Sequence, residues 1–519
     1  MWYNQGIHPI HCTTFKEGQL KMREETRSAF EDFTLSLSSA EAEALSAFFE
    51  DYAHHNFLHA REKAQMRVDF ENAILQYRAR GVSLSEALRR LAVCNLGSFY
   101  ARPSLRWFPL DNAAKIYPFS MAHGRMAVFR LSVYMTEAII PDILQIALSF
   151  TIKRFPSFAT TVKKGFFWHY LDTSKRRYSL EPEESMPCKP LKVARSGSQS
   201  FRVIYYQNRV SIEFFHVLAD GSGGMVFLKT LMTEYLRLLG FEAGQDGGAL
   251  DINDTPSQRE LADAFAMVPR TEKSSGFVSR PAVQMSGKLC RQKPCRVLHF
   301  KMDGGALRAA AKQYDATVTS YLLALIFIAC KHATDETRGM MRVQVPVNMR
   351  KFYPSKTLRN FSMYCGIQLP IQTIADVRSI TGEITAQLSE KASRHAMSEM
   401  VTAAARIVSS LRFIPLFIKT PAVKLVNGIL SDRLFSTTLS NLGVVHMPPE
   451  LTKHVESMDV VMGPSATNRA ACSLVTFGNG STLSITKSTA DPSFEETLYD
   501  LLTADSVSLA VEGSALYED

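Results

Sequence analysis

The sequence has 519 residues, of which 46% are hydrophobic and 21% are charged. These proportions are typical of a globular protein with one large core or two to three ordinary cores, and they exclude a fibrous or disordered chain. The formal net charge of +9 favours anionic partners. No run of Lys and Arg interleaved with aromatic residues predicts nucleic-acid binding, so we expect no nucleic-acid partner.

Eight cysteines are scattered along the chain, without a Cys-x-x-Cys pair or a histidine at metal-binding spacing. We therefore expect free thiols, a reducing compartment and no metal site. The first thirty residues contain Glu17, Glu24 and Glu25 and lack the apolar core of a signal peptide. The longest apolar runs, such as residues 321–330, are shorter than the roughly 20 residues that span a bilayer. A cytoplasmic protein is the expectation.

Residues 1–102 are predicted to form a helical N-terminal extension. Residues 38–41 and 83–86 both read Ser-x-x-Glu, the pattern of a capping box at the start of a helix. Pro103 and the segment 106–111 interrupt the helical pattern, and we place a domain boundary there.

The next part of the chain, residues 103–290, is predicted to be a mixed half of strands and helices. In chain order the patterns predict a strand at 126–135, a helix at 139–153, a hairpin of strands 201–206 and 210–215 that turns at Asn208, and a helix at 225–239 that ends at Gly240. Residues 241–290 lack sustained periodicity and are rich in turn-forming residues, which predicts a long linker.

Residues 291–519 are predicted to form a second mixed half of similar size. The predicted strands are 296–301, 342–347, 361–369, 437–445, 456–462, 470–477 and 481–487, and the predicted helices are 306–312, 320–331, most of 380–410 and one from about 493. No short-period repeat is visible.

One motif carries chemistry: His216, four residues later Asp220, then Gly221, at a predicted strand–turn–helix junction. An exposed histidine at a strand end, with an ordinary pKa near 6.5, exchanges protons at neutral pH. Asp220 is placed to hold the loop by pairing with an arginine. The glycines of 221–224 permit backbone angles that other residues resist. The alternative is a structural histidine followed by a flexible turn, and the position of the motif at the junction favours the catalytic interpretation.

His-x-x-x-Asp-Gly at a strand end, in two mixed halves, resembles the superfamily of CoA-dependent acyltransferases. That superfamily includes chloramphenicol acetyltransferase, plant BAHD acyltransferases, fungal alcohol acetyltransferases and nonribosomal-peptide condensation domains. The resemblance covers about residues 103–510 and is greatest to bacterial alcohol-acetyltransferase-like and condensation-like proteins. The segments that carry it, besides the motif, are 107–117, 154–158, 164–168, 345–350 and 439–443. It implies an α/β (α+β) fold of two chloramphenicol-acetyltransferase-like mixed-sheet subdomains around a central channel.

Two signatures of the superfamily are missing. Condensation domains often carry two adjacent histidines, whereas Phe215 stands where the first would be. The BAHD signature Asp-Phe-Gly-Trp-Gly is absent, and residues 477–480 are better explained as a hairpin turn. These departures disfavour a standard peptide-bond-forming module and a plant-type BAHD enzyme.

The resemblance implies transfer of an acyl group from acyl-CoA or an acyl carrier protein to a hydroxyl or amine, with acyl-CoA as a co-substrate and no permanently bound cofactor. His216 is then the general base, and its imidazolium protonates the departing thiolate. Ser440 or Asn441 is the candidate donor to the oxyanion, with ordinary strand polarity before a turn as the alternative. His216 is expected in a cleft between the halves, facing Ser440 and Asn441.

By the same analogy Asp220 forms a structural ion pair, with Arg130 and Arg350 as possible partners. The basic residues Arg350, Lys351, Lys356 and Arg359 are candidates for the phosphates of CoA or for an acidic carrier protein, and a solvated charged face is the alternative.

Other classes of function compete less well. No Gly-x-Ser-x-Gly elbow supports a serine hydrolase, and Gly221–Gly224 lacks the ending of a P-loop. The non-catalytic rival is a degenerate member of the superfamily that binds a carrier protein or lipid without turnover. The stretch 407–426, apolar with Arg412, Lys419 and Lys424, is a candidate for peripheral membrane contact or for a core helix broken at its prolines.

Overall fold

The structure is a computed structural model of the chain. It describes residues 27–55, 60–92, 107–124, 126–173, 177–191, 199–242, 244, 246–272, 280–420, 433–464 and 468–514. The first 26 residues, the predicted boundary at Pro103 and Lys424 therefore lie outside the described residues.

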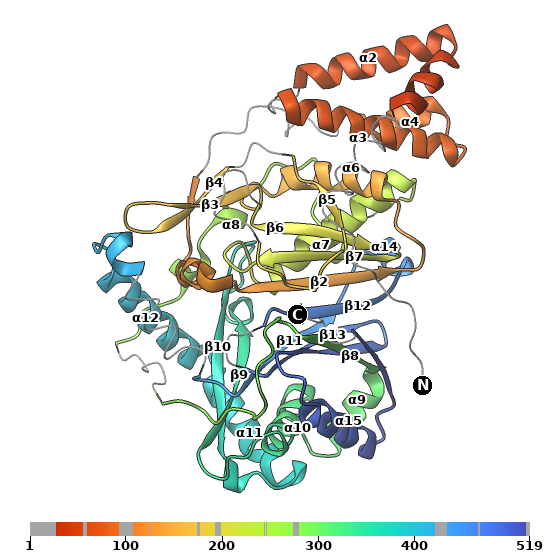
Figure 1. Ribbon diagram of the computed structural model, residues 1–519. Coiled ribbons are helices and arrows are strands. Elements are labelled where there is room, and N and C mark those ends of the chain that lie inside the picture. The colour runs from red at the N-terminus through yellow and green to blue at the C-terminus, as the bar shows by residue number, and fades with distance from the viewer. Residues whose placement is uncertain are drawn as a thin grey trace.

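A helical layer precedes the mixed part of the chain, as predicted (Figure 1). It contains the helices α2 (Ser39–His55), α3 (Ala60–Ala79) and α4 (Leu84–Arg90). The capping box at Ser38 is present in both directions, whereas at Ser83 only the serine caps, because the Glu86 carboxylate pairs with arginines of its own helix. The layer packs on α6 (Pro141–Thr151), at the end of the molecule away from the second sheet.

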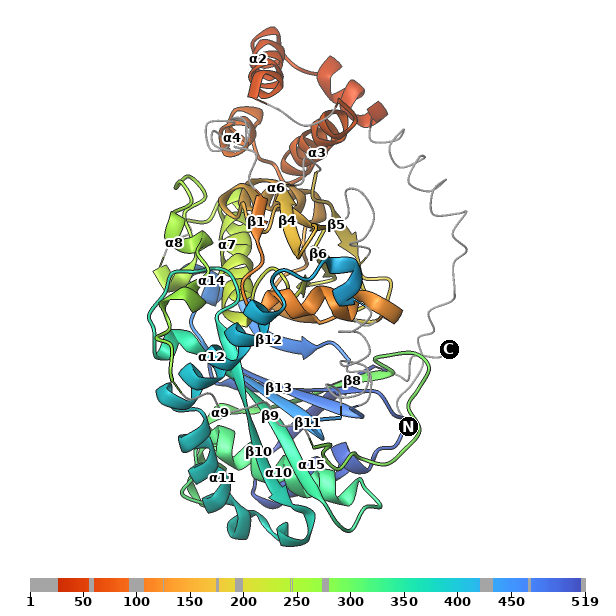
Figure 2. The same cartoon turned by 90° about the vertical axis from the view of Figure 1, so that its left-hand side faces the viewer.

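The first large sheet has five strands in the order β12-β2-β7-β6-β5. Its strands are β2 (Val128–Met135), β5 (Leu180–Pro182), β6 (Phe201–Tyr206), β7 (Arg209–Phe215) and β12 (Val455–Met462). Helices α6 and α7 (Gly221–Leu239) cover one face of this sheet (Figure 2). A small sheet, β1-β4-β3, lies beside it, formed by β1 (Trp107–Pro109), β3 (Thr160–Lys164) and β4 (His169–Thr173), and the 3-10 segments η2 (Ala114–Gly124) and η3 (Ile152–Arg154) complete this half.

The predicted hairpin is confirmed as β6 and β7, which turn at Gln207 and Asn208. The following helix, α7, begins at Gly221, four residues before its predicted start. The reason is that Asp220 caps it: one carboxylate oxygen accepts a hydrogen bond from the Gly223 amide at 3.0 Å, and this offsets the poor helix propensity of the glycines. The linker contains only short elements, η4 (Asp246–Gly248), α8 (Gln258–Leu261) and η5 (Ala264–Met267).

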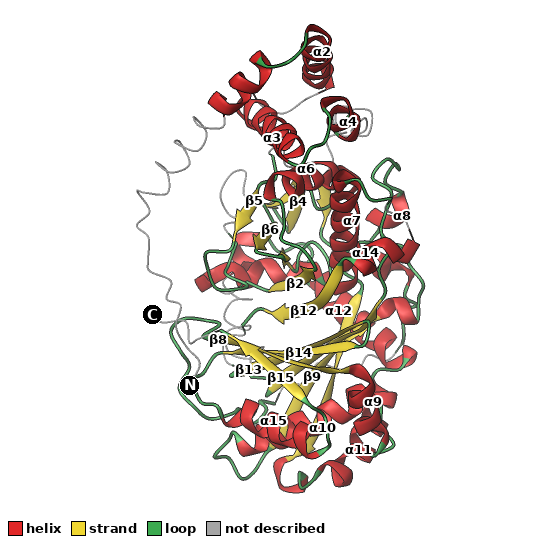
Figure 3. Cartoon of the chain, turned by 90° about the vertical axis from the view of Figure 1, so that its right-hand side faces the viewer, coloured by secondary structure: helices red, strands yellow, loops and turns green. Residues whose placement is uncertain are grey.

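The second large sheet has seven strands in the order β10-β9-β11-β13-β14-β8-β15. The strands are β8 (Arg296–Asp303), β9 (Met340–Asn348), β10 (Ser362–Pro370), β11 (Thr437–Val445), β13 (Ala470–Phe477), β14 (Gly480–Lys487) and β15 (Leu509–Gly513). Its helices are α9 (Gly304–Lys312), α10 (Val318–His332), α11 (Val377–Lys391), α12 (Arg394–Ser410) and α15 (Ser493–Ala504), with η6 (Met349–Lys351) and η7 (Ile371–Thr373). The short helix α14 (Pro449–Lys453) contacts α7 and β12 of the first sheet instead. Residues 320–330 of α10 are buried on every side, because the helix packs against α11 and α15 as well as the strands (Figure 3).

Three features of the second half were not predicted. Strand β12 leaves its sequence neighbours and pairs antiparallel with β2, so it completes the first sheet while packing against β13 and β14. Strand β15 follows the last helix and pairs with β8. The predicted helix 380–410 is two helices, because Ser393 ends the continuity and caps α12.

The predicted fold class is confirmed: two mixed sheets with flanking helices follow an N-terminal helical region. Among the described residues, no helix combines the length and the apolar character needed to cross a bilayer.

Candidate active site

His216 lies at the point where the chain leaves β7. Its backbone amide still donates to the Ala127 carbonyl at 2.8 Å, which continues the pairing of β7 with the segment before β2. The chain then turns sharply, with the Leu218 amide donating to the Phe215 carbonyl at 3.0 Å. Residues 217–219 are fully buried, which fixes the turn in the core. These contacts fix the backbone of His216 at the end of strand β7.

Asp220 connects the His216 turn to the second half of the chain. Its Oδ1 caps α7, and its Oδ2 accepts hydrogen bonds from Arg350 Nη1 and from the Phe361 amide, both at 2.7 Å. Arg350 also donates to the carbonyls of Thr357 and Arg359. Of the two arginines considered from the sequence, Arg350 is therefore the partner of Asp220. The Asp220 carboxylate therefore fastens the His216 turn to the loop that joins β9 and β10.

The glycines after Asp220 are needed because a side chain there would clash with neighbouring residues. They do not adopt unusual backbone angles, which corrects the interpretation from sequence. None of Gly221, Gly223 and Gly224 has a positive φ. A side chain at Gly223 would collide with the Leu358 carbonyl oxygen, and one at Gly224 would lie 3.0 Å from the Phe214 ring. Glycine therefore lets the first turn of α7 approach the second half closely.

Asn360 holds the ring of His216. Its amide nitrogen donates to the His216 carbonyl at 2.9 Å and lies 3.4 Å from a carboxylate oxygen of Asp111, so both neighbours of that nitrogen are acceptors. The amide oxygen of Asn360 is then the atom that lies 2.9 Å from His216 Nδ1. Because a carboxamide oxygen only accepts, Nδ1 carries the proton and Nε2 keeps its lone pair.

The environment of the ring keeps His216 neutral. Tyr117 stacks on the imidazole with ring centroids 4.7 Å apart, and Phe129 meets it edge-on at 5.1 Å. Burial lowers the pKa of His216 below its usual range, although Asp220 and the Asn360 hydrogen bond act in the opposite direction. Burial also raises the pKa of Asp111, the carboxyl behind Asn360, to about 6 against the opposing effect of Arg359. At neutral pH the imidazole is a base ready to accept a proton.

His216 borders a cavity of about 620 Å³ that both halves of the chain line. The first half contributes Phe129, His216, Gly221 and Met225, among others, and the second half contributes residues of β9, β10, β11 and β12. Asn360, the residue that contacts Nδ1, is not among the residues that line the cavity. A volume of this size accommodates a small-molecule substrate.

Ser440 and Asn441, on β11, line the same cavity as His216, as expected from the sequence. Their side chains differ in what they are free to do. Asn441 donates to the Thr319 hydroxyl at 2.9 Å and accepts from the Gly443 amide at 2.8 Å, where β11 has a bulge. The Ser440 hydroxyl has no hydrogen-bond partner within the described part of the chain.

The four basic residues proposed for CoA phosphates do not form one face. Arg350 is committed to Asp220, and Arg359 is only 3% exposed, pairs with Asp111 at 3.6 Å and donates to the Pro109 carbonyl. These two arginines therefore hold the site together from inside. Lys351 and Lys356 are exposed and remain available for an anionic partner.

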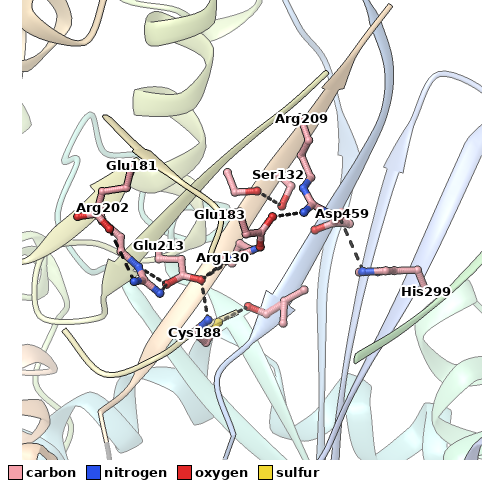
Figure 4. A network of polar contacts seen from close by, with 12 residues as sticks. Arg130, Ser132, Glu181, Glu183, Cys188, Arg202, Arg209, Glu213, His299 and Asp459 are labelled. Carbon is pink, nitrogen blue, oxygen red and sulfur yellow. Dashed lines mark hydrogen bonds and ion pairs between the residues drawn. The ribbon is translucent and has the colours of Figure 1, made fainter. Parts of the chain in front are cut away.

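Arg130, the other arginine considered for Asp220, belongs to a separate buried network (Figure 4). It contacts Glu213 and Glu183, while Arg202 also pairs with Glu213 and Arg209 with Glu183. The network continues on β12 and β8, where Asp459 accepts from Tyr134 at 2.6 Å and lies 4.0 Å from His299. Burial lowers the pKa of His299, which keeps that imidazole neutral.

Sequence reasoning missed Asn360 and Asp111. Asp111 stands in the segment 107–117 that carries part of the resemblance, but nothing in that segment indicates contact with the motif. Asn360 lies 144 residues from His216 along the chain. Only the folded positions of β7 and of the loop before β10 bring them together.

No known sequence family model matches the chain, and neither does any curated protein sequence. Solved structures do match its fold. Polyketide synthase associated protein 5 from Mycobacterium tuberculosis is 14% identical, with a TM-score of 0.52, and the match covers 77% of this chain and 98% of that one. The TRI3 trichothecene 15-O-acetyltransferase from Fusarium sporotrichioides is 13% identical, with a TM-score of 0.51, over 77% of this chain and 95% of that one.

The first condensation domain of the CDA synthetase is 13% identical, with a TM-score of 0.52, and the match covers 79% of this chain and all of that one. The chain therefore has the fold shared by these acetyltransferases and condensation domains. The resemblance noted from its sequence is confirmed at the level of fold.

Proposed function

We propose that the protein is an acyltransferase in which His216 is the general base. One observation carries the proposal: the imidazole borders a cavity shared by both halves, while Asn360 occupies its Nδ1 and leaves the Nε2 lone pair for a substrate. A neutral imidazole in that state accepts a proton from a hydroxyl or amine at neutral pH. The fold shared with the trichothecene acetyltransferase and the condensation domain supports acyl transfer as the reaction class.

In the proposed reaction, the acceptor attacks the thioester carbonyl of acyl-CoA or of an acyl carrier protein as His216 takes its proton. The tetrahedral intermediate collapses, the C–S bond breaks, and the imidazolium returns the proton to the thiolate. Ser440 is our candidate donor to the oxyanion, because the residue lines the cavity and its hydroxyl has no hydrogen-bond partner among the described residues, whereas Asn441 supports the β11 bulge. No covalent intermediate with the protein is required.

Asp220 and Arg350 are proposed as positioning residues. They join the His216 turn to the loop after β9 across the two halves, so the base and the cavity wall keep a fixed geometry. Lys351 and Lys356 are our remaining candidates for the phosphates of CoA or for an acidic carrier protein, and acyl-CoA is proposed as a co-substrate that leaves after each cycle.

The experiment is incubation of the purified protein with a panel of acyl-CoAs and a panel of alcohols and amines, followed by mass spectrometry. Acylated acceptor and free CoA in equal amounts are the expected products. Release of CoA without an acylated acceptor would indicate a hydrolase. Retention of acyl-CoA without turnover across the panel would favour the degenerate, binding-only member of the superfamily.

A further inference from the structure

Five large exposed apolar side chains belong to two segments of the protein that contact each other. They are Phe166 and Phe167, between β3 and β4, and Phe413, Phe417 and Ile418, after α12; we call them the phenylalanine patch. Phe166 is 67% exposed, and Phe413 and Phe417 are each 71% exposed. Isolated exposed apolar residues are ordinary on protein surfaces, but a cluster of this kind marks an interaction site.

The two segments are joined by defined contacts. The Leu416 amide donates to the Phe166 carbonyl at 2.8 Å, and Lys419 Nζ donates to the Phe167 carbonyl at 2.8 Å. Leu416 itself is buried and anchors the second segment. In Figure 1 the segment after α12 lies next to the tip of the β3–β4 hairpin.

A buried cation–π contact supports the patch from below. The Lys419 ammonium lies 3.4 Å from the centroid of the Trp168 ring, and Lys419 is only 2% exposed. Such a contact gains strength when it is removed from water. The contact between Lys419 and Trp168 thus fixes the two segments that carry the exposed phenylalanines.

The charged side chains around the patch are mostly basic, with Asp172, 3.6 Å from Lys163, as an acidic neighbour. Residues 157–171 and 400–420 contain no acidic side chain. Exposed basic side chains flank the phenylalanines at Lys163, Lys164, Arg406 and Arg412, and the Arg412 guanidinium lies 4.2 Å from the centroid of the Phe413 ring. The whole chain also has a formal charge of +9. Protein surfaces that insert into the interface of an anionic bilayer are rich in aromatic side chains with lysine and arginine around them.

We infer that the phenylalanine patch docks the protein on the surface of an anionic lipid bilayer, with the five apolar side chains inserted among the headgroups and the basic side chains against lipid phosphates. The two segments meet the membrane while the sheets stay outside it. This inference rests on the surface alone and does not depend on the role of His216.

The test is flotation of the full chain with vesicles of phosphatidylcholine, alone or mixed with phosphatidylglycerol. We expect binding to the mixed vesicles, weakened by high salt. The double variant F413S/F417S should bind at least tenfold more weakly, because burial of two phenylalanines is lost. The matched control is Leu35→Ser, which removes an apolar side chain that is 85% exposed on the N-terminal helical layer and should leave binding unchanged.

Three results would overturn the inference. One is a wild-type protein that stays in solution with the mixed vesicles. Another is equal binding by F413S/F417S, which would mean adsorption by charge without insertion. A third is a concentration-dependent dimer, measured by light scattering, that F413S/F417S abolishes while vesicles have no effect, since the patch would then be covered by a second copy of the chain. Turnover of water-soluble substrates by F413S/F417S should equal that of the wild type, which separates this test from the test of acyl transfer.

Discussion

The molecule contains two buried polar clusters, and they differ in whether one of their polar groups borders the cavity. Around Glu213, the guanidinium groups of three arginines meet three carboxylates, those of Glu183, Glu213 and Asp459 (Figure 4). Around His216, the side chains of Asp220 and Asn360 are bonded at both of their polar atoms, and the imidazole, bonded at Nδ1, borders the cavity. We call the first the closed cluster, because its charged groups pair with one another and none of its residues lines the cavity that His216 borders.

This difference distinguishes polar groups that stabilise the fold from a polar group that can react with a substrate. Buried charged groups that pair with one another join neighbouring strands and are not accessible to a substrate. A neutral base at a cavity wall, held by a carboxamide and an ion pair behind it, is prepared for proton transfer. If this comparison is correct, substitutions in the two clusters will affect different quantities: the rate of acyl transfer in one and the free energy of unfolding in the other.

The largest effect on rate is expected from His216→Ala. Removal of the general base should lower kcat by about 10²–10⁴-fold. The side chain borders a cavity and its backbone contacts remain, so the thermal unfolding transition should stay close to that of the wild type. The measurement is steady-state kinetics with the best acyl-CoA and acceptor, beside calorimetry. Turnover near the wild-type level by a folded variant would remove the base from the mechanism.

Asp220→Asn should have the next largest effect. Asparagine still caps α7, so the helix start is preserved, but the charge that holds Arg350 and the Phe361 amide is lost. A shift of the His216 turn by about 1 Å costs roughly 10²-fold in rate. We expect a fall in kcat with little change in KM, together with a loss of about 1–3 kcal/mol in the free energy of unfolding.

Asp220→Ala is the matched comparison. It removes the helix cap as well as the ion pair, so it should be less stable than Asp220→Asn by about 1 kcal/mol, with a similar kcat. Equal rates for Asp220→Asn and the wild type would show that the ion pair is not needed to place His216.

Asn360→Leu is expected to lower kcat by about tenfold, because the Nδ1 proton loses its acceptor and the ring is free to change tautomer. The pH profile tests this role more sharply than the rate. The wild-type base is active only when neutral, and burial lowers its pKa, so kcat/KM should hold down to about pH 6.5 and fall on further acidification.

Asn360→Asp places a carboxylate where the carboxamide oxygen was. A negative charge beside Nδ1 favours the imidazolium, so it raises the pKa of His216, and the acid limb of the profile should move to higher pH. A purely structural role for Asn360 would lower the rate without moving that limb.

The two clusters also differ in how far the sequence predicted them. His216 and Asp220 were found because one short motif lies at a junction of local patterns, and local periodicity also predicted most strands and helices. Asn360 and Asp111 reach His216 only through contacts between segments far apart in the chain. The sequence also assigned strand β12 to the second half, although it pairs with β2 of the first sheet. Its apolar pattern fits either sheet, and only the packed structure determines which one it joins.

The choice between Arg130 and Arg350 shows the same limit. Arg130 lies within one predicted strand and Arg350 follows the end of another, and sequence spacing contains no information on which carboxylate each one meets. Arg130 lies directly opposite Glu213 on the neighbouring strand, so register settles its partner. Arg350 reaches Asp220 because the loop after β9 folds over the start of α7.

The smallest effect on rate is expected in the closed cluster, from Glu213→Gln. Glu213 is fully buried and accepts hydrogen bonds from Arg130 at 2.8 Å, Arg202 at 2.7 Å and the Cys188 amide at 2.6 Å. Glutamine keeps the shape but removes the fully buried charge that Arg130 and Arg202 share, so Arg130 keeps only Glu183 and Arg202 only the more distant Glu181. Loss of one partner of a buried ion pair costs about 3–5 kcal/mol, so we expect a change of that size in chemical denaturation.

Turnover per folded molecule should change by less than about twofold, since no atom of this cluster is bonded to His216. The control is Glu181→Gln, whose carboxylate is 50% exposed and lies 3.9 Å from Arg202; its removal should cost no more than about 1 kcal/mol. A rate that falls with Glu213→Gln while the protein remains folded would mean that the two clusters communicate through β7, because that strand carries Glu213 and ends next to His216.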